Sequence, residues 1–569
     1  MSRQSYRRSE GQKVAPDELS VGTQPIQPVD GDPGKPRRPN LLSRLLAHDR
    51  LTLALLIAIA ALTRLPFLRA RGSWDADQGH DMLVLRSFVQ DGVIPLLGPP
   101  TSIGDFHHGA LYYFLLAPAA FLSGAQPFAV VLELALLGIA AVPVVWWLAR
   151  SIGGPVIGPV AGFIAGLLIA MSPSAIETST FIWNPNPIPL FAALAYAAAW
   201  RARQSGRARW WAVAVVAAGV VMQLHVLGSI FVIAIFGAAL VAPGAIGRRA
   251  AGQAVVAGLA IVALTYLPLL AHELGSNWEE TGKVVAFFTG GGARESSLDP
   301  AQRLVFTTLR AIGWPLVGLV TDVPYASVAA VAVAIALAVW RSRAANIEER
   351  LAARWLAATV GWGIVGLTFM APSLSTVVEG LPNDHYHAFL DPAVFALVGL
   401  GLAALISERP APLPGVRATP PLVDRTARSL AILGLAGLLV VQVGQWPPLT
   451  ASDGGYPAAE AAAQRIIEVS PRNAWITLAG LPRFKTTEGV EFPLRVLGAK
   501  IVPAADAGVL VIVCDRLFEP VIHETCGGPA EATIVGESER FVELVDRFPL
   551  SKRTEISVYV PRDCCPVPE

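Results

Sequence analysis

The feature that most constrains this chain is a series of long apolar segments that recurs as far as about residue 450. A helix that crosses a bilayer needs about 20 apolar residues, and most of these segments approach that length. Hydrophobic residues make up 53% of the chain, charged residues make up 15%, and the mean hydropathy is +0.52. This composition excludes an ordinary soluble protein. The sequence therefore predicts an α-helical polytopic membrane protein.

We expect about 11 transmembrane helices. The predicted spans are 51–69, 128–148, 156–173, 186–201, 210–225, 226–243, 252–270, 325–341, 353–371, 388–406 and 428–446. An odd number of spans places the two ends of the chain on opposite sides of the membrane. The apolar stretch 109–123 is short and carries tyrosines, so we expect a helix at the outer surface there and not a span.

Arginines in the short loops predict the orientation of the chain in the membrane. They occur in four clusters: Arg201, Arg203, Arg207 and Arg209; Arg248 and Arg249; Arg341, Arg343, Arg350 and Arg354; and Arg409, Arg417 and Arg425. With the predicted spans, all four clusters fall on one side, and cytoplasmic loops carry an excess of basic residues. We therefore expect a cell-membrane protein with a cytoplasmic N-terminus and an extracytoplasmic C-terminal part.

Composition divides the chain into three predicted domains. Residues 1–44 are polar and rich in Pro, Gly, Ser and Gln, which predicts a disordered cytoplasmic tail. Residues 45–450 form the transmembrane domain, with outer loops at 71–127 and 271–324. The second loop contains Gly290–Gly292, which suits a mobile lid or, as the favoured interpretation, a loose connector. Residues 451–569 have the composition of a small soluble α/β domain.

This last domain has recognisable elements of its own. Strand patterns occur at Val509–Cys514 and Thr554–Val560, and helical patterns occur at 457–468 and 537–547. All four cysteines lie here, namely Cys514, Cys526, Cys564 and Cys565. Their confinement to an outer domain suits disulfide formation in an oxidising compartment. Cys514 with Cys526 is the preferred pair, although spacing alone leaves the connectivity open.

The first outer loop is the richest in ionisable groups. It holds five aspartates (Asp75, Asp77, Asp81, Asp91 and Asp105) and three histidines (His80, His107 and His108) between two strongly apolar segments. In a membrane protein, such a concentration points to chemistry or ion binding. Asp75 and Asp77 are the candidate catalytic residues, because a carboxylate there suits a general base for an acceptor hydroxyl or amine. One of them is equally suited to capping the next helix.

The remaining candidate substrate-binding residues lie at the predicted outer face. His107 and His108 precede Tyr112 at the entry to the short apolar helix, where they suit a phosphate contact. Together with Asp105, the two histidines are also candidate ligands of a divalent metal, although adjacent histidines are a weak signal for one. The others are Glu177, Asn184, Arg303, His385 and Tyr386. For each residue alone, ordinary turn and loop chemistry is an alternative; the cluster as a whole favours a site.

The order of these motifs resembles the polytopic glycosyltransferases of the GT-C type. Within them it looks most like the branch of protein O-mannosyltransferases and the aminoarabinose transferase of lipid A. The resemblance covers about residues 45–450 and is carried by Asp75-Ala-Asp77-Gln78, His108-Gly-Ala-Leu-Tyr-Tyr, the acidic turn at Glu177, and His385-Tyr386 before a late span. The family commonly has Asp-Glu where this chain has Asp77-Gln78. The replaced acid leaves open whether Asp75 takes part of its role.

The resemblance implies a reaction and its partners. The donor would be a sugar on a polyprenyl phosphate, and the acceptor an envelope glycan, lipid or protein at the outer face of the lipid bilayer. The reaction would invert the anomeric centre, with Asp77 as the base and cationic contacts to the leaving phosphate. Candidates for those contacts are Arg69, Arg71, His108, Arg303, Arg310 and His385. No basic tract indicates nucleic acid, and no nucleotide-sugar motif is present.

Two other classes of protein remain as alternatives. A secondary transporter or lipid flippase places ionisable groups near the bilayer midplane and often shows paired repeats. Here no repeat is evident, and the charged residues lie mostly in outer loops, with Glu133 inside a predicted span as an exception. A non-catalytic assembly protein is the third interpretation, and it predicts full function after both Asp75 and Asp77 are replaced by Asn.

Overall fold

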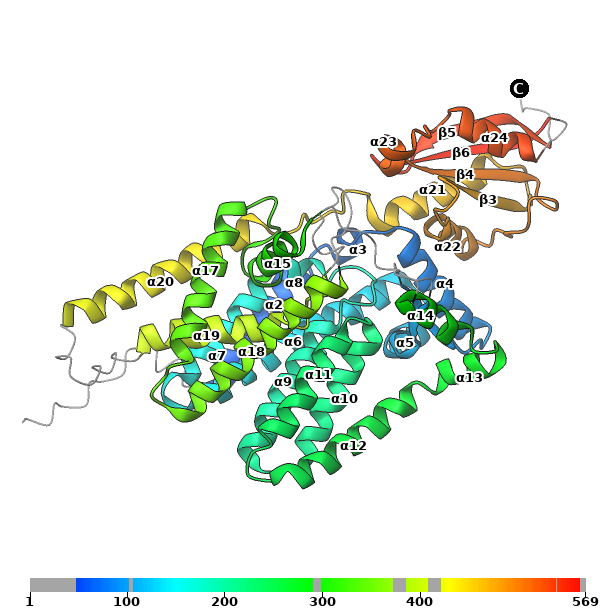
Figure 1. Cartoon of the computed structure of the whole chain (residues 1–569). Helices are drawn as coiled ribbons and strands as arrows, with labels where there is room; N and C mark the ends of the chain where they lie inside the picture. The colour runs from blue at the N-terminus through cyan, green and yellow to red at the C-terminus, as the bar shows by residue number, and fades with distance from the viewer. Residues whose placement is uncertain are drawn as a thin grey trace, which may run out of the picture. The chain divides into compact units, whose positions relative to one another are not determined.

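The computed structural model of the chain, drawn in Figure 1, describes residues 48–101, 106–289, 298–371, 385–407, 421–538 and 540–562. Several predictions fall outside these ranges: those on the tail 1–44, on Asp105, on Gly290–Gly292, on Arg409 and Arg417, and on Cys564 and Cys565. Residues from Leu42 to Glu569 belong to one compact unit. The predicted domain boundary at residue 451 stays a prediction.

Within the described ranges, a helix lies at each predicted span. These helices are α2 (Asp49–Arg64), α6 (Pro127–Ile152), α7 (Gly154–Met171), α9 (Ile188–Ser205), α10 (Arg209–Leu224), α11 (Gly228–Val241), α12 (Gly247–Thr265), α17 (Pro324–Arg341), α18 (Ile347–Met370), α19 (Asp391–Ser407) and α20 (Pro421–Gly444). In α6, α7, α12, α17, α18 and α20, the described residues are long and apolar enough to cross a membrane. Helices α10, α11 and α19 are apolar but shorter. The prediction of a helical polytopic membrane protein is confirmed.

Small residues bring the central helices close together. A Cβ atom on Gly166 of α7 would lie 2.7 Å from Leu56 of α2, and one on Gly162 would lie 3.0 Å from the carbonyl oxygen of Trp146 in α6. A Cβ atom on Gly399 of α19 would lie 2.8 Å from the carbonyl oxygen of Ala161 in α7. Membrane helices associate through such close packing, because lipid tails are as apolar as the side chains themselves. Helix α7 therefore forms the centre of the bundle.

The first loop folds into short elements. They are α3 (Leu68–Arg71), α4 (Ala76–Gln90), β1 (Leu97–Pro100), β2 (His107–Gly109) and α5 (Leu111–Ser123), with α8 (Pro173–Glu177) following α7. Strands β1 and β2 are antiparallel, and Pro100 is paired with His107. The two histidines thus lie in a strand, whereas the sequence predicted the start of a helix. This pairing holds them extended, and the helix begins only at Leu111.

The second predicted loop is more regular than a loose connector. Its described residues form α13 (Leu267–Gly275), α14 (Glu279–Thr289), α15 (Pro300–Thr308), the π-helix η1 (Leu309–Gly313) and α16 (Trp314–Val317). Asp299 caps α15, and its side chain accepts hydrogen bonds from the backbone N–H groups of Ala301 and Gln302. The described part of this segment is therefore helical, and the prediction of a lid or connector at Gly290–Gly292 stays a prediction.

The C-terminal part contains the predicted small sheet. Its order is β3-β4-β6-β5, with β3 parallel to β4 and the other pairs antiparallel. The elements are α21 (Gly455–Val469), β3 (Ile476–Leu481), α22 (Glu488–Val496), β4 (Val509–Asp515), η3 (Arg516–Phe518), α23 (Glu519–Ile522), α24 (Pro529–Glu537), β5 (Phe541–Pro549) and β6 (Thr554–Pro561). A disulfide joins Cys514 to Cys526, as the sequence favoured.

One predicted helix, at 537–547, is instead the edge strand β5. Phe541, Leu544, Val545 and Phe548 have the spacing of a helix face, which misled the prediction. In the structure, β5 pairs along its length with β6 and buries only the two phenylalanines near its ends. Pairing with a neighbouring strand outweighed a weak local periodicity.

Candidate active-site cavity

A cavity of about 490 Å³ lies where α4 meets the loops at one end of the helix bundle. We call it the acidic cavity. It is lined by Asp77, His80, Asp81, Pro99, Pro100, Thr101, His108, Trp183, Asn184, His225, Tyr386, Thr486 and Glu488. These residues come from the first loop, the turn before α9, the end of α10, the approach to α19 and the start of α22. The cavity therefore unites parts of the chain that are distant in sequence.

Asp77 is the exposed carboxylate of this cavity. It lies in the first turn of α4, and among the described residues its side chain has no hydrogen-bond or ion-pair partner. The surrounding protein and the negative charge of Asp75 raise the pKa of the Asp77 carboxyl above its usual range. A carboxylate that is accessible, unpaired and more basic than usual has the properties of a general base.

Asp75 has a different environment. It is the N-cap of α4, accepting a hydrogen bond from the backbone N–H of Ala76 at 2.8 Å, while the Gln78 side chain accepts from the Asp75 N–H. Its carboxylate also pairs with Arg553 and lies 3.4 Å from Nζ of Lys485. Burial tends to raise the pKa of Asp75, but these two cations hold it below its ordinary value. Asp75 is therefore the capping aspartate, as one of the two sequence alternatives proposed.

Two more titratable groups of α4 face the cavity. The buried Asp81 accepts a hydrogen bond from the Tyr113 hydroxyl at 2.8 Å, and burial raises the pKa of its carboxyl to about 7. Nδ1 of His80 lies 2.8 Å from Oε1 of Glu488, and this hydrogen bond raises the pKa of His80. Glu488 belongs to α22, so the C-terminal part of the chain supplies a charged group to the cavity.

Aromatic side chains form the opposite wall. The rings of His225 and Tyr386 are stacked 3.8 Å apart, His108 lies 5.1 Å from His225, and Trp183 lies 6.0 Å from Tyr386. Burial and the neighbouring His107 lower the pKa of His108 to about 4, so its imidazole is neutral at pH 7. Asn184 donates a hydrogen bond to the Leu224 carbonyl at 2.5 Å and thereby ties this wall to the end of α10.

The structure brings together only some of the predicted substrate-binding residues. His108, Asn184 and Tyr386 line the acidic cavity. The others lie elsewhere: His107 within 3.2 Å of Glu280, Tyr112 in the buried core, Glu177 near Asp322, Arg303 on α15, and His385 against Trp183. Burial and the charge of Asp322 raise the pKa of Glu177 to about 7.

The predicted cationic contacts are also distributed differently. Arg71 donates to the Thr63 carbonyl at 2.6 Å, and Arg310 lies over the Trp314 ring at 5.1 Å. No lysine or arginine is among the described residues that line the acidic cavity. In the same described ranges, no three His, Cys, Asp or Glu side chains are arranged to hold a metal ion.

Sequence reasoning missed Thr486 and Glu488. They reach the cavity because α22 packs directly on α4: a Cβ atom on Gly79 would lie 2.2 Å from the Glu488 backbone. The indole N–H of Trp74 also donates to the Gly489 carbonyl at 2.8 Å. The available signal was Gly79 itself, since a glycine inside a helix often marks a close backbone approach.

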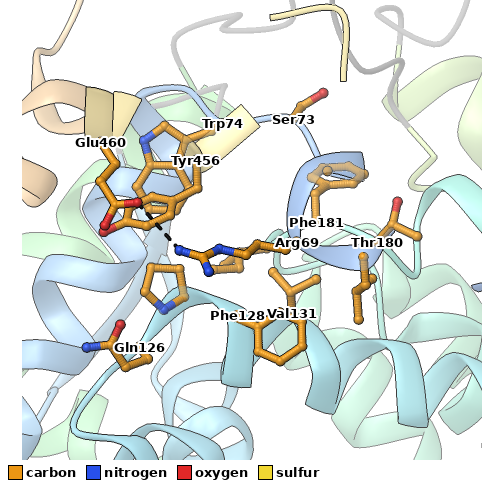
Figure 2. A pocket seen from close by; sticks show the side chains of 14 residues that line it. Arg69, Ser73, Trp74, Gln126, Phe128, Val131, Thr180, Phe181, Tyr456 and Glu460 are labelled. Atoms are coloured by element: carbon orange, nitrogen blue, oxygen red, sulfur yellow. Dashed lines mark ion pairs between the residues drawn. The ribbon is translucent and has the colours of Figure 1, made fainter. Parts of the chain in front are cut away.

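A second cavity of about 480 Å³ lies beside the residues that lead into α4. We call it the apolar cavity, and Figure 2 shows Arg69 in it reaching toward Glu460, with 3.7 Å between Nη2 and Oε2. It is lined by Leu68, Arg69, Gly72, Ser73, Trp74, Gln126, Pro127, Phe128, Val131, Thr180, Phe181, Ile182, Tyr456 and Glu460. The Trp74 and Tyr456 rings are 4.7 Å apart. Arg69, one of the predicted cationic contacts, therefore lines the apolar cavity and not the acidic one.

Glu133, the acid within a predicted span, has a local partner. Its carboxylate accepts a hydrogen bond from the backbone N–H of Ala119 at 3.3 Å, one residue after Pro118 inside α5. A proline inside a helix disturbs the backbone hydrogen bonds around it. This hydrogen bond to α5 explains why an acid is placed inside the span. Glu133 alone therefore does not indicate a transporter.

Comparisons with known proteins bear on the fold and the family. Residues 107–272 match the family described as dolichyl-phosphate-mannose-protein mannosyltransferase. The apo structure of ArnT from Cupriavidus metallidurans is similar with a TM-score of 0.57 and 14% identity, covering 90% of this chain and 98% of that one. Its complex with undecaprenyl phosphate gives 0.56 and 14%, covering 91% and 99%. A comparison with curated protein sequences found no match.

A more distant likeness is to the oligosaccharyltransferase of Archaeoglobus fulgidus tethered to an acceptor peptide. Its TM-score is 0.47 at 14% identity, covering 82% of this chain and 69% of that one. The family match over residues 107–272 indicates a membrane glycosyltransferase, and the chain shares the fold of ArnT.

Proposed function

We propose that the protein transfers a glycosyl group from a polyprenyl-phosphate-linked sugar to an envelope glycan, lipid or protein, with inversion and with Asp77 as the general base. The contrast between Asp77 and Asp75 carries the proposal. Asp77 lines the cavity without a partner, whereas Asp75 is engaged by the helix cap and by two cations. That ArnT binds undecaprenyl phosphate supports a donor of the same chemical class.

The proposed step uses one base and one leaving group. Asp77 takes the proton of the acceptor hydroxyl or amine as that atom bonds to the anomeric carbon. The bond from the anomeric carbon to the phosphate oxygen breaks on the opposite face, and its electron pair stays with the polyprenyl phosphate. Trp183 and Tyr386 offer ring faces in the same cavity that suit the apolar face of a sugar.

The position of the acidic cavity supports chemistry on the outer side of the membrane. Helix α9 begins beside Asn184 and ends near Arg203, which lies 3.4 Å from Glu348 at the start of α18. The cavity and the predicted cytoplasmic arginines are thus at opposite ends of α9. With basic residues inside, the cavity and the disulfide-bonded C-terminal part face outward, which suits an oxidising compartment.

The test is transfer from a radiolabelled polyprenyl-phosphate sugar pool to membrane acceptors. Wild type is compared with Asp77→Asn and Asp75→Asn at equal expression. We expect Asp77→Asn to lose transfer while it still binds the donor lipid, and Asp75→Asn to retain part of it. Loss in Asp75→Asn alone would move the base two residues upstream. If the wild type does not bind the lipid donor, the proposal fails and a transporter becomes the better interpretation.

A further inference from the structure

The acidic cavity raises a problem of charge. When a sugar leaves a phosphodiester, the polyprenyl phosphate gains a negative charge, which a cation must stabilise. The lining residues that the structure describes include the acids Asp77, Asp81 and Glu488 but no lysine or arginine. His108 cannot supply a charge, because burial keeps it neutral. A cation is needed, and one histidine of the lining is placed to provide it.

That histidine is His80. It lies three residues after Asp77 on α4, so the two side chains share one face of the helix. Its Nδ1 is engaged by Oε1 of Glu488 at 2.8 Å, which leaves the N–H on the other ring nitrogen, Nε2, for a ligand in the cavity. The side chain is about one-third exposed, at 32%, so a ligand can reach it.

The charged groups that raise the pKa of His80 are three acids. Asp77 and Asp81 lie on its own helix, and Glu488 faces it from α22; each of the three favours the imidazolium form. The nearby cations are engaged with other acids: Arg553 and Lys485 each pair with both Asp75 and Asp515. These acids favour the protonated form of His80 beside Asp77, where the reaction needs a cation.

We propose that His80 contacts the phosphate of the lipid donor, and that Glu488 is the positioning residue that orients it. This inference rests on the proposed function and deepens it. As the acceptor atom bonds to the anomeric carbon, Asp77 receives the acceptor proton and the phosphate oxygen keeps the electron pair of the broken bond. His80 donates a charge-assisted hydrogen bond to that phosphate and keeps its own proton. No further reactant is needed.

The first experiment measures binding of two purified lipids, undecaprenyl phosphate and undecaprenol, to the full chain in detergent. Removing the His80 cation with His80→Gln should weaken binding of undecaprenyl phosphate about ten- to a hundredfold. Binding of undecaprenol, which lacks the phosphate, should not change. The control is His523→Gln, the same replacement at an exposed histidine of the C-terminal part. Equal binding of undecaprenyl phosphate by wild type and His80→Gln would overturn the inference.

The second experiment measures the pH dependence of transfer. If His80 acts as a cation, activity falls as pH rises through its pKa, which Glu488 holds above the ordinary value. Glu488→Gln should move that fall to lower pH, and His80→Lys should move it far upward while restoring donor binding. Glu491→Gln, on the same helix but paired with Arg495, is the matched control and should leave the profile in place.

These outcomes separate the inference from the function on which it rests. A wild type that neither binds the donor nor transfers sugar would refute the proposed function. A wild type that transfers sugar, with a Glu488→Gln profile identical to its own, would refute only the role of the His80–Glu488 pair. A purely structural role predicts equal losses for both lipids and no rescue by His80→Lys.

Discussion

The acidic cavity and the apolar cavity have nearly equal volumes, about 490 and 480 Å³, and differ in chemistry. The same chain segments build both, since Trp74 and Ile182 line one while Asp77 and Trp183 line the other. In the apolar cavity the charges are Arg69 and Glu460, which face each other. In the acidic cavity, carboxylates outnumber cations. The two cavities therefore differ in the balance of charge and not in size, and this balance is the basis for proposing the acidic cavity as the active site.

The two cavities also differ in how the C-terminal part contributes. Tyr456 and Glu460 of α21 line the apolar cavity, and Thr486 and Glu488 line the acidic one. Only the second contribution places a charge beside a titratable group of α4, at 2.8 Å from His80. We therefore expect substitutions around the acidic cavity to change catalysis and those around the apolar cavity to change little.

The largest effect should come from Asp77→Asn, which removes the proposed base and keeps the shape of the side chain. The transfer rate should fall about 10²- to 10⁴-fold, the usual contribution of general-base catalysis. Single-turnover transfer with saturating donor measures it. Asp91→Asn, at the exposed end of the same helix, is the control and should behave as wild type. A normal rate in Asp77→Asn would remove the functional contrast between the cavities.

The next largest effect should come from Gly79→Ala, which separates α4 from α22. The added Cβ atom would lie 2.2 Å from backbone atoms of Glu488, and backbone cannot rotate away as a side chain can. Overpacking of this kind costs about 1–3 kcal/mol, so both the melting temperature and the transfer rate should fall. Gly361→Ala, on a helix face with open space, should change neither. An unaffected Gly79→Ala would show that Glu488 does not need close contact with α4.

A smaller effect is expected at Asp75, where two variants separate two roles. Asp75→Asn keeps an N-cap side chain and loses the charge that pairs with Arg553 and Lys485, whereas Asp75→Ala loses both. The cap contributes about 1 kcal/mol, and the partly exposed ion pairs contribute less. We therefore expect Asp75→Ala to unfold at a lower temperature than Asp75→Asn. If the two variants have the same melting temperature, capping of α4 is not the main role of Asp75.

The smallest effect should come from Arg69→Gln in the apolar cavity. This exposed guanidinium, 70% accessible, has a single loose partner in Glu460, and surface ion pairs of this kind contribute about 0–1 kcal/mol. Transfer should stay within about fivefold of wild type, the rate factor to which about 1 kcal/mol corresponds. A loss as large as that of His80→Gln would place the donor phosphate in the apolar cavity and reverse the comparison.

Much of the fold was predictable because apolar length is a strong signal. Every predicted span contains a helix, and the strands at Val509 and Thr554 lie where hydrophobic runs placed them. The edge strand β5 was not predictable, since its pairing with β6 competes with a helical spacing in the same residues. The helices within 271–324 were not predicted because each is short. The segment as a whole was interpreted as a loop.

The site was predictable in part. Asn184 and Tyr386 lie next to predicted spans, and Asp77 and His108 lie in the first outer loop, where ionisable residues stand out. Glu488 lies 408 residues after His80 in a segment that reads as an ordinary helix start, and only the tertiary fold brings the two together. Nor does sequence give the pKa of a histidine: burial lowers the pKa of His108 to about 4, and the hydrogen bond with Glu488 raises the pKa of His80.

The ion pair between Asp75 and Arg553 joins residues 478 positions apart. At about 5–20 residues per second, a ribosome needs roughly half a minute to a minute and a half to make the intervening chain. The helix that carries Asp77 is thus synthesised early and waits for its last partner until the final strand exists. A nascent or prematurely ended chain has the carboxylate but lacks Glu488 and Arg553. We therefore expect glycosyl transfer to begin only after the chain has been synthesised through Arg553.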